Sequence, residues 1–323
     1  MRTPANHPQQ QPAYPRHTTS SHKWPKPLIA VVCIGSVVTI AALIALASFA
    51  WSLVHGLFFQ AASPNASAQS SPYLDGDTSV NASINPSYVS PYNPQYMTHQ
   101  DGRFTYSDTE GPDQYTSSTG IDVSEHQGSI DWQAVAQDGI DFAYIRIGYR
   151  GYTEGGIQKD AYFEENYQGA RDAGLQVGVY FFSQALTEDE AREEAQFVLD
   201  TLDGRPIDLC VAFDEEPAGG EGSRAAGLSS QQFQANAQAF CQVISDSELS
   251  PMVYGNVGDL SGVDWQNLEL PMWLAQYNEP FPYSWFDVAM WQYTSSGSVA
   301  GIGTRVDMNL LFLAVAPEDA TVE

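Results

Sequence analysis

The sequence is short of cysteine and of positive charge, and each shortage excludes a class of protein. Three cysteines among 323 residues are too few for a disulfide framework or a Cys-rich zinc site. Lys and Arg number 13 against 39 Asp and Glu. The first 26 residues hold four of the basic residues and no acid, so the remainder carries a net charge of −30. A body this acidic repels polyphosphate, which argues against nucleic acid as a partner.

One long run has no charge at all. Leu28 to Val54 is apolar over 27 residues, and about 20 apolar helical residues cross a bilayer. The run predicts a transmembrane anchor at 28–54, preceded by a basic cytoplasmic tail at 1–27. Because basic residues precede the run and no charge follows until Asp75, we expect the later chain to face outward. Secretion after cleavage at Ala66-Ser67-Ala68, or a buried core helix, are the alternatives.

The segment 55–118 has the composition of a linker. It is rich in Ser, Pro, Asn, Tyr, Gln and Gly and shows no sustained apolar periodicity. These features predict a low-complexity, partly extended linker that holds a domain away from the membrane.

From 119 to 316 short apolar runs alternate with helical patterns, which predicts an α/β domain, followed by a C-terminal tail at 317–323. Eight runs predict strands: TGIDVS, FAYIRIGY, LQVGVYFF, LCVAFDEE, PMVYG, LPMWLAQY, VAMWQYT and VDMNLLF. Helices are expected near 131–137, 163–173, 188–202 and 230–245. The first four strands alternate with helices and are apolar on both faces, which predicts a parallel sheet covered on both sides. Eight such strands most simply close into a β/α barrel with an incomplete set of helices. An open doubly wound sheet is the competing arrangement.

Four acids fall at strand ends, where a β/α barrel carries its chemistry: Asp122, Asp214, Glu216 and Asp307. Asp214 and Glu216 are two residues apart on an extended chain, so both side chains point the same way and Glu215 points the opposite way. Two carboxylates on one face raise each other's proton affinity, and a protonated acid beside an ionised one suits glycosidic bond cleavage. Ligation of a hard cation, or a merely acidic strand end, are the alternatives.

Aromatic residues favour a saccharide ligand. Six lie in or at the ends of strands: Tyr180, Tyr254, Trp273, Tyr277, Trp291 and Tyr293. Sugars present apolar C–H faces and hydroxyl groups, which suit flat side chains that carry a polar tip. At least half of these rings are nevertheless expected to fill the barrel core.

Seven segments keep a common order along the chain. They are Gly120-Ile121-Asp122-Val123-Ser124 with Gln127-Gly128, Asp141 to Arg146, Ala173-Gly174-Leu175 with Gly178 to Ser183, Phe213 to Glu216, Trp273 to Tyr277, Trp291-Gln292-Tyr293 and Val306-Asp307. Together they resemble glycoside hydrolase family 25 lysozymes over about 120–312.

The resemblance implies a flattened barrel that cleaves the β-1,4 bond between N-acetylmuramic acid and N-acetylglucosamine. It implies that Glu216 is the general acid and that Asp214 assists the 2-acetamido group of the substrate as nucleophile. Asp122 and Asp307 would support them, and Tyr180 would line the same pocket. The middle residue of the Asp-x-Glu motif is usually uncharged in the family, whereas here it is Glu215.

The sequence therefore predicts a membrane-anchored muramidase acting on peptidoglycan outside the cell. We expect Glu216, Asp214, Asp122 and Asp307 to be catalytic, and Tyr180, Trp273, Tyr277 and Trp291 to bind substrate. No histidine has a second His or Cys at metal-ligand spacing, so neither a metal nor a cofactor is expected. A catalytically silent wall-binding module, or a hydrolase of another N-acetylated glycan, are the alternatives.

Overall fold

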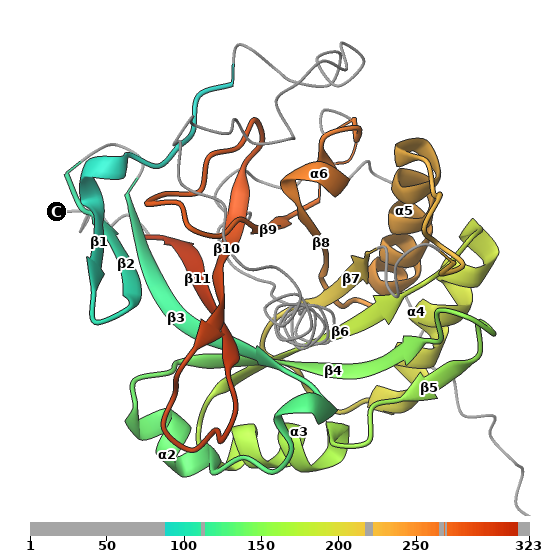
Figure 1. Ribbon diagram of the computed structural model, residues 1–323, viewed down its shortest axis with the longest axis horizontal. Coiled ribbons are helices and arrows are strands. Elements are labelled where there is room, and N and C mark those ends of the chain that lie inside the picture. The colour runs from blue at the N-terminus through green and yellow to red at the C-terminus, as the bar shows by residue number, and fades with distance from the viewer. Residues whose placement is uncertain (1–87, 111–113, 217–221, 265–267, 269, 316–323) are drawn as a thin grey trace, which may run out of the picture.

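Eight strands close into a barrel in the computed structural model, which describes residues 88–110, 114–216, 222–264, 268 and 270–315 (Figure 1). The barrel strands are β3 (Tyr115–Val123), β4 (Phe142–Arg150), β6 (Gln176–Ser183), β7 (Val211–Glu215), β8 (Pro251–Asn256), β9 (Met272–Ala275), β10 (Val288–Gly297) and β11 (Val306–Ala314). Their order around the barrel is β3, β11, β10, β9, β8, β7, β6, β4, and β4 pairs with β3 to close it. The predicted barrel is confirmed, and the open sheet is excluded.

The sheet is not parallel throughout, which corrects the expectation for its last strand. From β3 through β4, β6, β7, β8, β9 and β10 each neighbouring pair is parallel. Strand β11 is antiparallel to both β10 and β3. The chain between β10 and β11 is too short for a crossover helix, and strands joined directly by a short loop must run in opposite directions.

Four longer helices lie outside the barrel near their predicted positions: α2 (Trp132–Gln137), α3 (Phe163–Asp172), α4 (Glu188–Leu202) and α5 (Ser230–Asp246). Thr187 and Ser229 cap α4 and α5 by accepting hydrogen bonds from the amides of Glu190 and Gln232, at 3.3 and 3.2 Å. Helix α3 packs on β4 and β6, α4 packs on the same two strands, and α5 packs on β7 and β8. The helices therefore cover one side of the barrel only (Figure 1).

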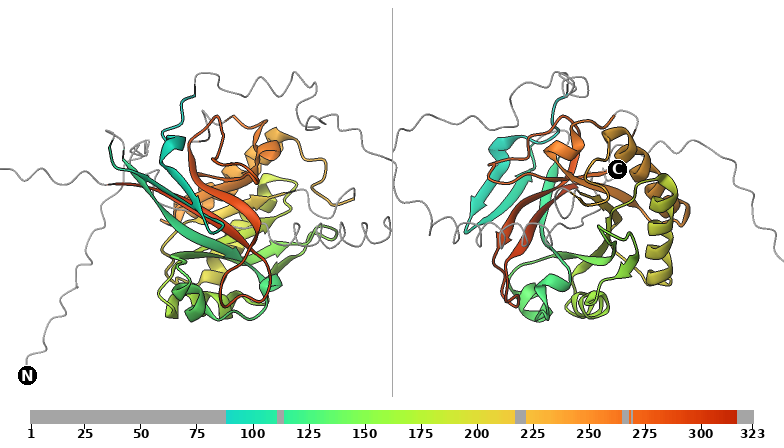
Figure 2. Two further views of the ribbon diagram at one scale, coloured as in Figure 1. Left: turned by 60° about the vertical axis from the view of Figure 1, so that its left-hand side comes forward. Right: turned by 45° about the vertical axis from the view of Figure 1, so that its right-hand side comes forward.

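The opposite side is covered by a hairpin, which shows that the predicted linker 55–118 was wrong from residue 88 onward. Strands β1 (Met97–Gln100) and β2 (Arg103–Asp108) pair with each other, and β2 also pairs with β3 in the antiparallel direction (Figures 1 and 2). The ring of Phe104 lies 4.7 Å from that of Trp291 on β10, and Tyr92 stacks at 3.9 Å on Phe312 of β11. Because no helix follows β9 or β10, these rings shield an apolar wall that would otherwise face water.

Two layers of apolar side chains result, one inside the barrel and one between the barrel and its cover. The inner layer includes Tyr144, Tyr180, Tyr254 and Trp273. Glycine makes room for it, because a Cβ at Gly178 would collide with the Tyr144 ring. Bulky rings can therefore fill the barrel interior instead of leaving a pore.

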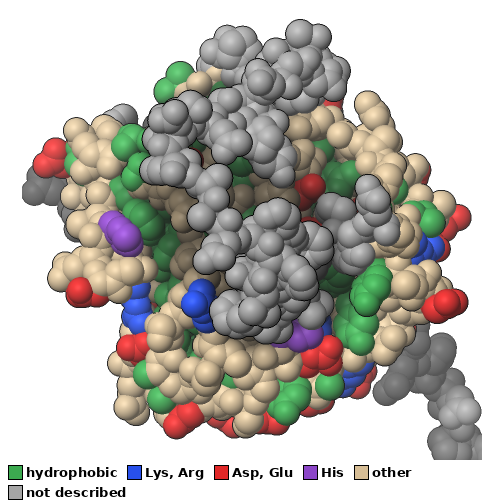
Figure 3. Space-filling view, viewed as in Figure 1, with side chains coloured by type: hydrophobic (Ala, Val, Ile, Leu, Met, Phe, Trp, Pro, Cys, Tyr) green, Lys and Arg blue, Asp and Glu red, His purple; other side chains and the backbone are tan. Residues whose placement is uncertain are grey.

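Shorter elements complete the described chain: β5 (Ile157–Lys159), α6 (Val257–Leu260), and the 3-10 turns η3 (Pro94–Tyr96) and η4 (Glu125–Gln127). No helix in the described ranges is long and apolar enough to span a bilayer. The predicted anchor at 28–54, the tail at 1–27 and the end at 317–323 lie outside those ranges. On the face shown in Figure 3, Asp and Glu side chains are spread around the rim.

Candidate active site

Asp122 and Asp307 are brought together by the antiparallel return of β11. The two residues are direct partners in the register of β3 and β11, and both are fully buried. They are 185 positions apart in the sequence, so only closure of the barrel makes them neighbours.

The end of β7 supplies Asp214 and Glu216 on the barrel side of the strand. Asp214 is level with Phe182 and Tyr254, which belong to the inner layer. Glu215 points the other way, toward the helices, where its Oε2 accepts a hydrogen bond from Asn236 Nδ2 on α5 at 3.4 Å. The alternation expected from the extended chain is therefore present.

Each of three acids in this cluster holds its proton more tightly than usual. Burial raises the pKa of Asp214 well above its ordinary value, and the nearby Glu216 and Asp122 raise it further, while Arg146 opposes them. Burial also raises the pKa of Glu216, followed by the charge of Asp259. For Asp307, burial, the Asp122 charge and a hydrogen bond with Asp122 all raise the pKa. Carboxylates packed this closely cannot all be ionised at neutral pH.

Asp259 is a fifth acid that the sequence analysis missed. It lies in α6, directly after β8, and Asn256 caps that helix by accepting a hydrogen bond from the Gly258 amide at 2.8 Å. Burial raises the pKa of Asp259 to about 6. Its position after the carboxyl end of a strand, which marked the other four acids, could have identified it.

Two amide side chains hold Asp122 and were also missed. Gln292 Nε2 and Asn309 Nδ2 donate to Asp122 Oδ2 at 2.9 and 2.7 Å. Trp273 Nε1 donates in turn to Asn309 Oδ1 at 3.1 Å. Asn309 is two residues beyond Asp307 on β11, so its inward orientation could have been inferred from strand alternation.

The side-chain oxygen of Gln292 is also held by hydrogen bonds. Its Oε1 accepts hydrogen bonds from the hydroxyls of Tyr254, at 3.3 Å, and of Tyr277. With the oxygen engaged by two donors, the amide NH₂ group must face the acids. A connected polar network of this kind fixes the orientation of its members.

The predicted aromatic residues divide between the two layers. Tyr180 and Trp273 belong to the inner layer, and the half-buried Tyr277 packs against it. Trp273 is completely buried and holds Asn309, so it fills the interior. Trp291 is fully buried and packs outward beneath Phe104, because its neighbour Gln292 points inward, so the structure does not bring Trp291 to the acids.

The described chain has neither a Cys210–Cys241 disulfide nor a cluster of metal ligands at the site. Cys241 is a free, buried thiol, so it forms no bond with Cys210. Among residues 88–110, 114–216, 222–264, 268 and 270–315, no group of three or more His, Cys, Asp or Glu side chains is arranged to hold a metal ion.

Comparisons with known proteins identify relatives of this chain. The sequence model described as "Glycosyl hydrolases family 25" matches residues 121–302. The autolytic lysozyme of Clostridium acetobutylicum is 29% identical over 191 residues, which are 59% of this chain and 54% of that protein. Lysozyme M1 of Streptomyces globisporus is 28% identical over 213 residues, 62% of this chain and 70% of that protein. The chain thus spans about half the length of the clostridial relative.

A solved structure shares the fold. The modular autolysin LytC of Streptococcus pneumoniae, in complex with a synthetic peptidoglycan ligand, superposes with a TM-score of 0.54 at 22% identity. The match covers 66% of this chain and 51% of that one. At this identity the similarity shows the barrel fold alone.

Proposed function

The chain belongs to family 25 of the glycosyl hydrolases, and from this premise we propose that it hydrolyses the glycan strands of peptidoglycan. Two of its relatives are named lysozymes. The single observation that carries the proposal is the pair of Asp214 and Glu216 at the end of β7, both buried and both with a pKa raised above the ordinary value.

The bond that we propose is the β-1,4 link between N-acetylmuramic acid and N-acetylglucosamine. Glu216 donates its proton to the leaving oxygen while the 2-acetamido oxygen of the substrate attacks the anomeric carbon. Asp214 orients and stabilises the acetamido group as it becomes positive. Glu216 then takes a proton from a water molecule, which bonds to the anomeric carbon and breaks that carbon's bond to the acetamido oxygen. This substrate-assisted route differs from the scheme of two catalytic carboxylates, in which a side chain is the nucleophile.

Asp122 and Asp307 have a supporting role in this proposal. The amides of Gln292 and Asn309 stabilise negative charge on Asp122. The raised pKa of Asp307, caused first by burial and then by Asp122, favours one proton shared between the two.

We further propose that the enzyme is tethered at the outer face of a cell membrane through Leu28–Val54. The support is the length of that uncharged run and the basic residues before it. A tether beside the wall gives the enzyme a high local concentration of substrate. Release after cleavage near Ala66-Ser67-Ala68 is the alternative, and N-terminal sequencing of the protein from cells distinguishes the two.

Mass spectrometry of fragments from digested walls tests the bond. The expected products carry new reducing ends of N-acetylmuramic acid. New reducing ends of N-acetylglucosamine would contradict the proposed bond. Walls that are bound but yield no new ends would instead identify a catalytically silent binding module, and cleavage of chitin oligomers alone would identify a hydrolase of another N-acetylated glycan.

A further inference from the structure

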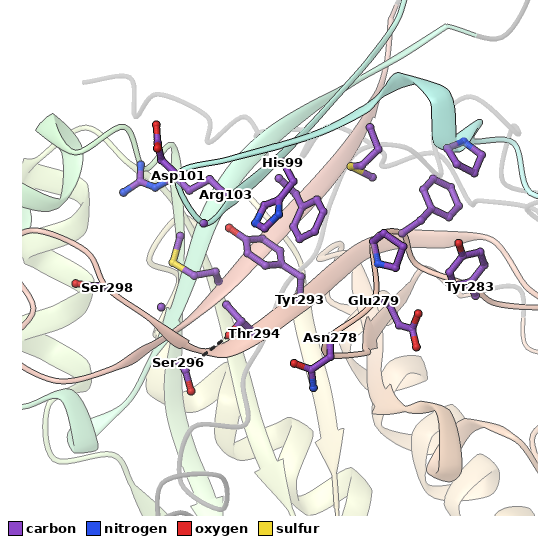
Figure 4. A pocket seen from close by; sticks show the side chains of 18 residues that line it. His99, Asp101, Arg103, Asn278, Glu279, Tyr283, Tyr293, Thr294, Ser296 and Ser298 are labelled. Carbon is purple, nitrogen blue, oxygen red and sulfur yellow. Dashed lines mark hydrogen bonds between the residues drawn. The ribbon is translucent and has the colours of Figure 1, made fainter. Parts of the chain in front are cut away.

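A cavity of about 860 Å³ lies outside the barrel, and none of the acids of the candidate active site lines it. One side is formed by β1 and β2 of the hairpin, including Met97, His99 and Phe104. The other side is formed by the chain after β9, from 278 to 283, and by the far ends of β10 and β11 (Figure 4). Its volume is that of a site for a small organic ligand.

This cavity shares its wall with the active site. On β10, Gln292 points toward the acids, and the next residue, Tyr293, lines the cavity. On β11, Asp307 points into the barrel, and the next residue, Met308, lines the cavity. After β9, Tyr277 bonds to Gln292 and the next residue, Asn278, lines the cavity. A ligand that extends over this rim can therefore reach both places.

The lining combines aromatic rings with hydroxyl and amide groups. The rings come from Phe104, Phe281, Tyr283 and Tyr293, and the polar groups from Asn278, Thr294, Ser296 and Ser298. Tyr283 is 52% exposed, which leaves its ring free to meet a ligand. Its backbone is fixed, because the Gln276 side chain accepts from its amide at 2.8 Å and donates to its carbonyl at 3.3 Å.

Tyr293 brings a buried polar group to the cavity. The residue is 4% exposed, and its hydroxyl oxygen lies within hydrogen-bonding reach of the backbone amide of Phe104. In Figure 4 the hydroxyl points toward the hairpin, near Arg103 and His99. Burial raises the pKa of Tyr293 to about 12, so the hydroxyl keeps its proton as a donor. A hydroxyl whose oxygen accepts from an amide still has its proton to donate, and a ligand can accept it.

The charges around the cavity exclude an anionic ligand. The guanidinium of Arg103 is engaged by Asp138, with an Nη2 to Oδ2 distance of 2.6 Å. Asp101 and Glu279 then leave excess negative charge in the lining. Phosphate-bearing polymers would be repelled, whereas a neutral sugar with C–H faces and hydroxyls would meet both kinds of group present.

We propose that this cavity is an accessory site for an uncharged N-acetylated saccharide, a continuation of the glycan strand beyond the active site. The proposal rests on the proposed function for the origin of the saccharide. Because the hairpin precedes residue 121, part of the site is built from residues outside the family match. The site would hold a long strand while its neighbouring segment is cleaved.

Calorimetric titration of the full chain with a β-1,4-linked N-acetylglucosamine tetramer tests the site. We expect two binding events for the wild type and one for Tyr283→Ala or Tyr293→Phe. Tyr152→Ala is the matched control: it removes an equally exposed tyrosine (49%) from the turn between β4 and β5, far from the hairpin, and should keep both events (Figure 1). Two events in both cavity variants would overturn the proposal.

Kinetics supply a second measurement. Tyr283→Ala should raise KM for intact walls about fivefold, the size expected for one lost aromatic contact, and leave kcat on short soluble fragments unchanged. An unchanged KM for intact walls in Tyr283→Ala would contradict the accessory site. If the wild type cleaves no peptidoglycan, the proposed function fails, but the number of binding events still decides the accessory site.

Discussion

Asp122 on β3 and Asp307 on β11 face each other across an antiparallel pair, and Gln292 on β10 donates its amide to both, at 2.9 and 3.4 Å. Two buried acids in contact repel when both are ionised. The amide of Gln292 offsets part of that repulsion because it presents N–H groups to both carboxyl groups and keeps its oxygen turned toward Tyr254 and Tyr277.

Gln292→Glu should therefore damage the site without changing its shape. The new carboxylate cannot donate to Asp122 and adds a buried charge, at a cost of about 3 kcal/mol when ionised. We expect kcat on walls at pH 7 to fall about 100-fold and to recover partly as the pH is lowered toward 5. A pH–rate profile measures this. Gln133→Glu, an exposed site on α2, is the control, and equal profiles for the two variants would contradict the role of Gln292.

Adjacent positions at the end of β7, Glu215 and Glu216, should differ sharply in their effect on activity. Glu216→Gln removes the proposed proton donor, and general acid catalysis contributes about 10²–10⁴-fold. Glu215→Gln changes the next residue, which points toward α5, and should keep activity within about threefold. Release of reducing ends from purified walls measures both, together with wall pull-down, which should persist for Glu216→Gln. Comparable activity losses in the two variants would refute the assignment of Glu216.

The pH dependence of stability should be weaker in Glu215→Gln. Burial raises the pKa of Glu215 well above its ordinary value, and the Glu194 charge adds to this. Burial also raises the pKa of Glu194 to about 7. A carboxyl with a raised folded pKa gives stability that is complete below the unfolded pKa, about 4.3, and is lost as the pH rises through the folded value.

Thermal unfolding from pH 4.5 to 8 checks this expectation. The Tm of the wild type should fall as the pH rises, and the Tm of Glu215→Gln should fall less, so the variant is the more stable protein at pH 8. Glutamine has nearly the same shape as glutamate, and its side-chain oxygen can still accept the hydrogen bond from Asn236. Parallel curves for the two proteins would mean that Glu215 does not hold a proton in the folded state.

The hairpin should be part of the folded unit, not an appendage. Phe104 is buried against Trp291 and Tyr293 on β10, with ring centroids 4.7 and 5.1 Å apart. Phe104→Ala should lower the free energy of unfolding by about 3 kcal/mol through lost burial and a cavity. Urea unfolding measures it, with Thr105→Ala on the exposed face of β2 as the control. Equal midpoints would show that the hairpin packs without stabilising the barrel.

Local patterns in the sequence predicted the elements because they depend on neighbouring residues. Thr187 and Ser229 cap α4 and α5 through side-chain contacts with residues only three positions further along the chain. Gly139 and Gly174 follow α2 and α3 with φ of 81° and 83°, where a side chain would be strained. The two-residue spacing of Asp214 and Glu216 likewise put both on one face of a strand.

Tertiary structure decided the rest. Strand β10 is buried on both faces, so its composition could not tell whether Trp291 or Gln292 points inward. The hairpin was misread because its few aromatic residues form a core only with rings from β10 and β11, far along the chain. Asp122 meets Asp307 only because the barrel closes between β3 and β11. The sequence by itself determined the strands, helices and acids, which follow from residue-to-residue periodicity. Register and closure determined which side chains meet, because contacts such as Asp122 with Asp307 and Phe104 with Trp291 join residues more than 100 positions apart.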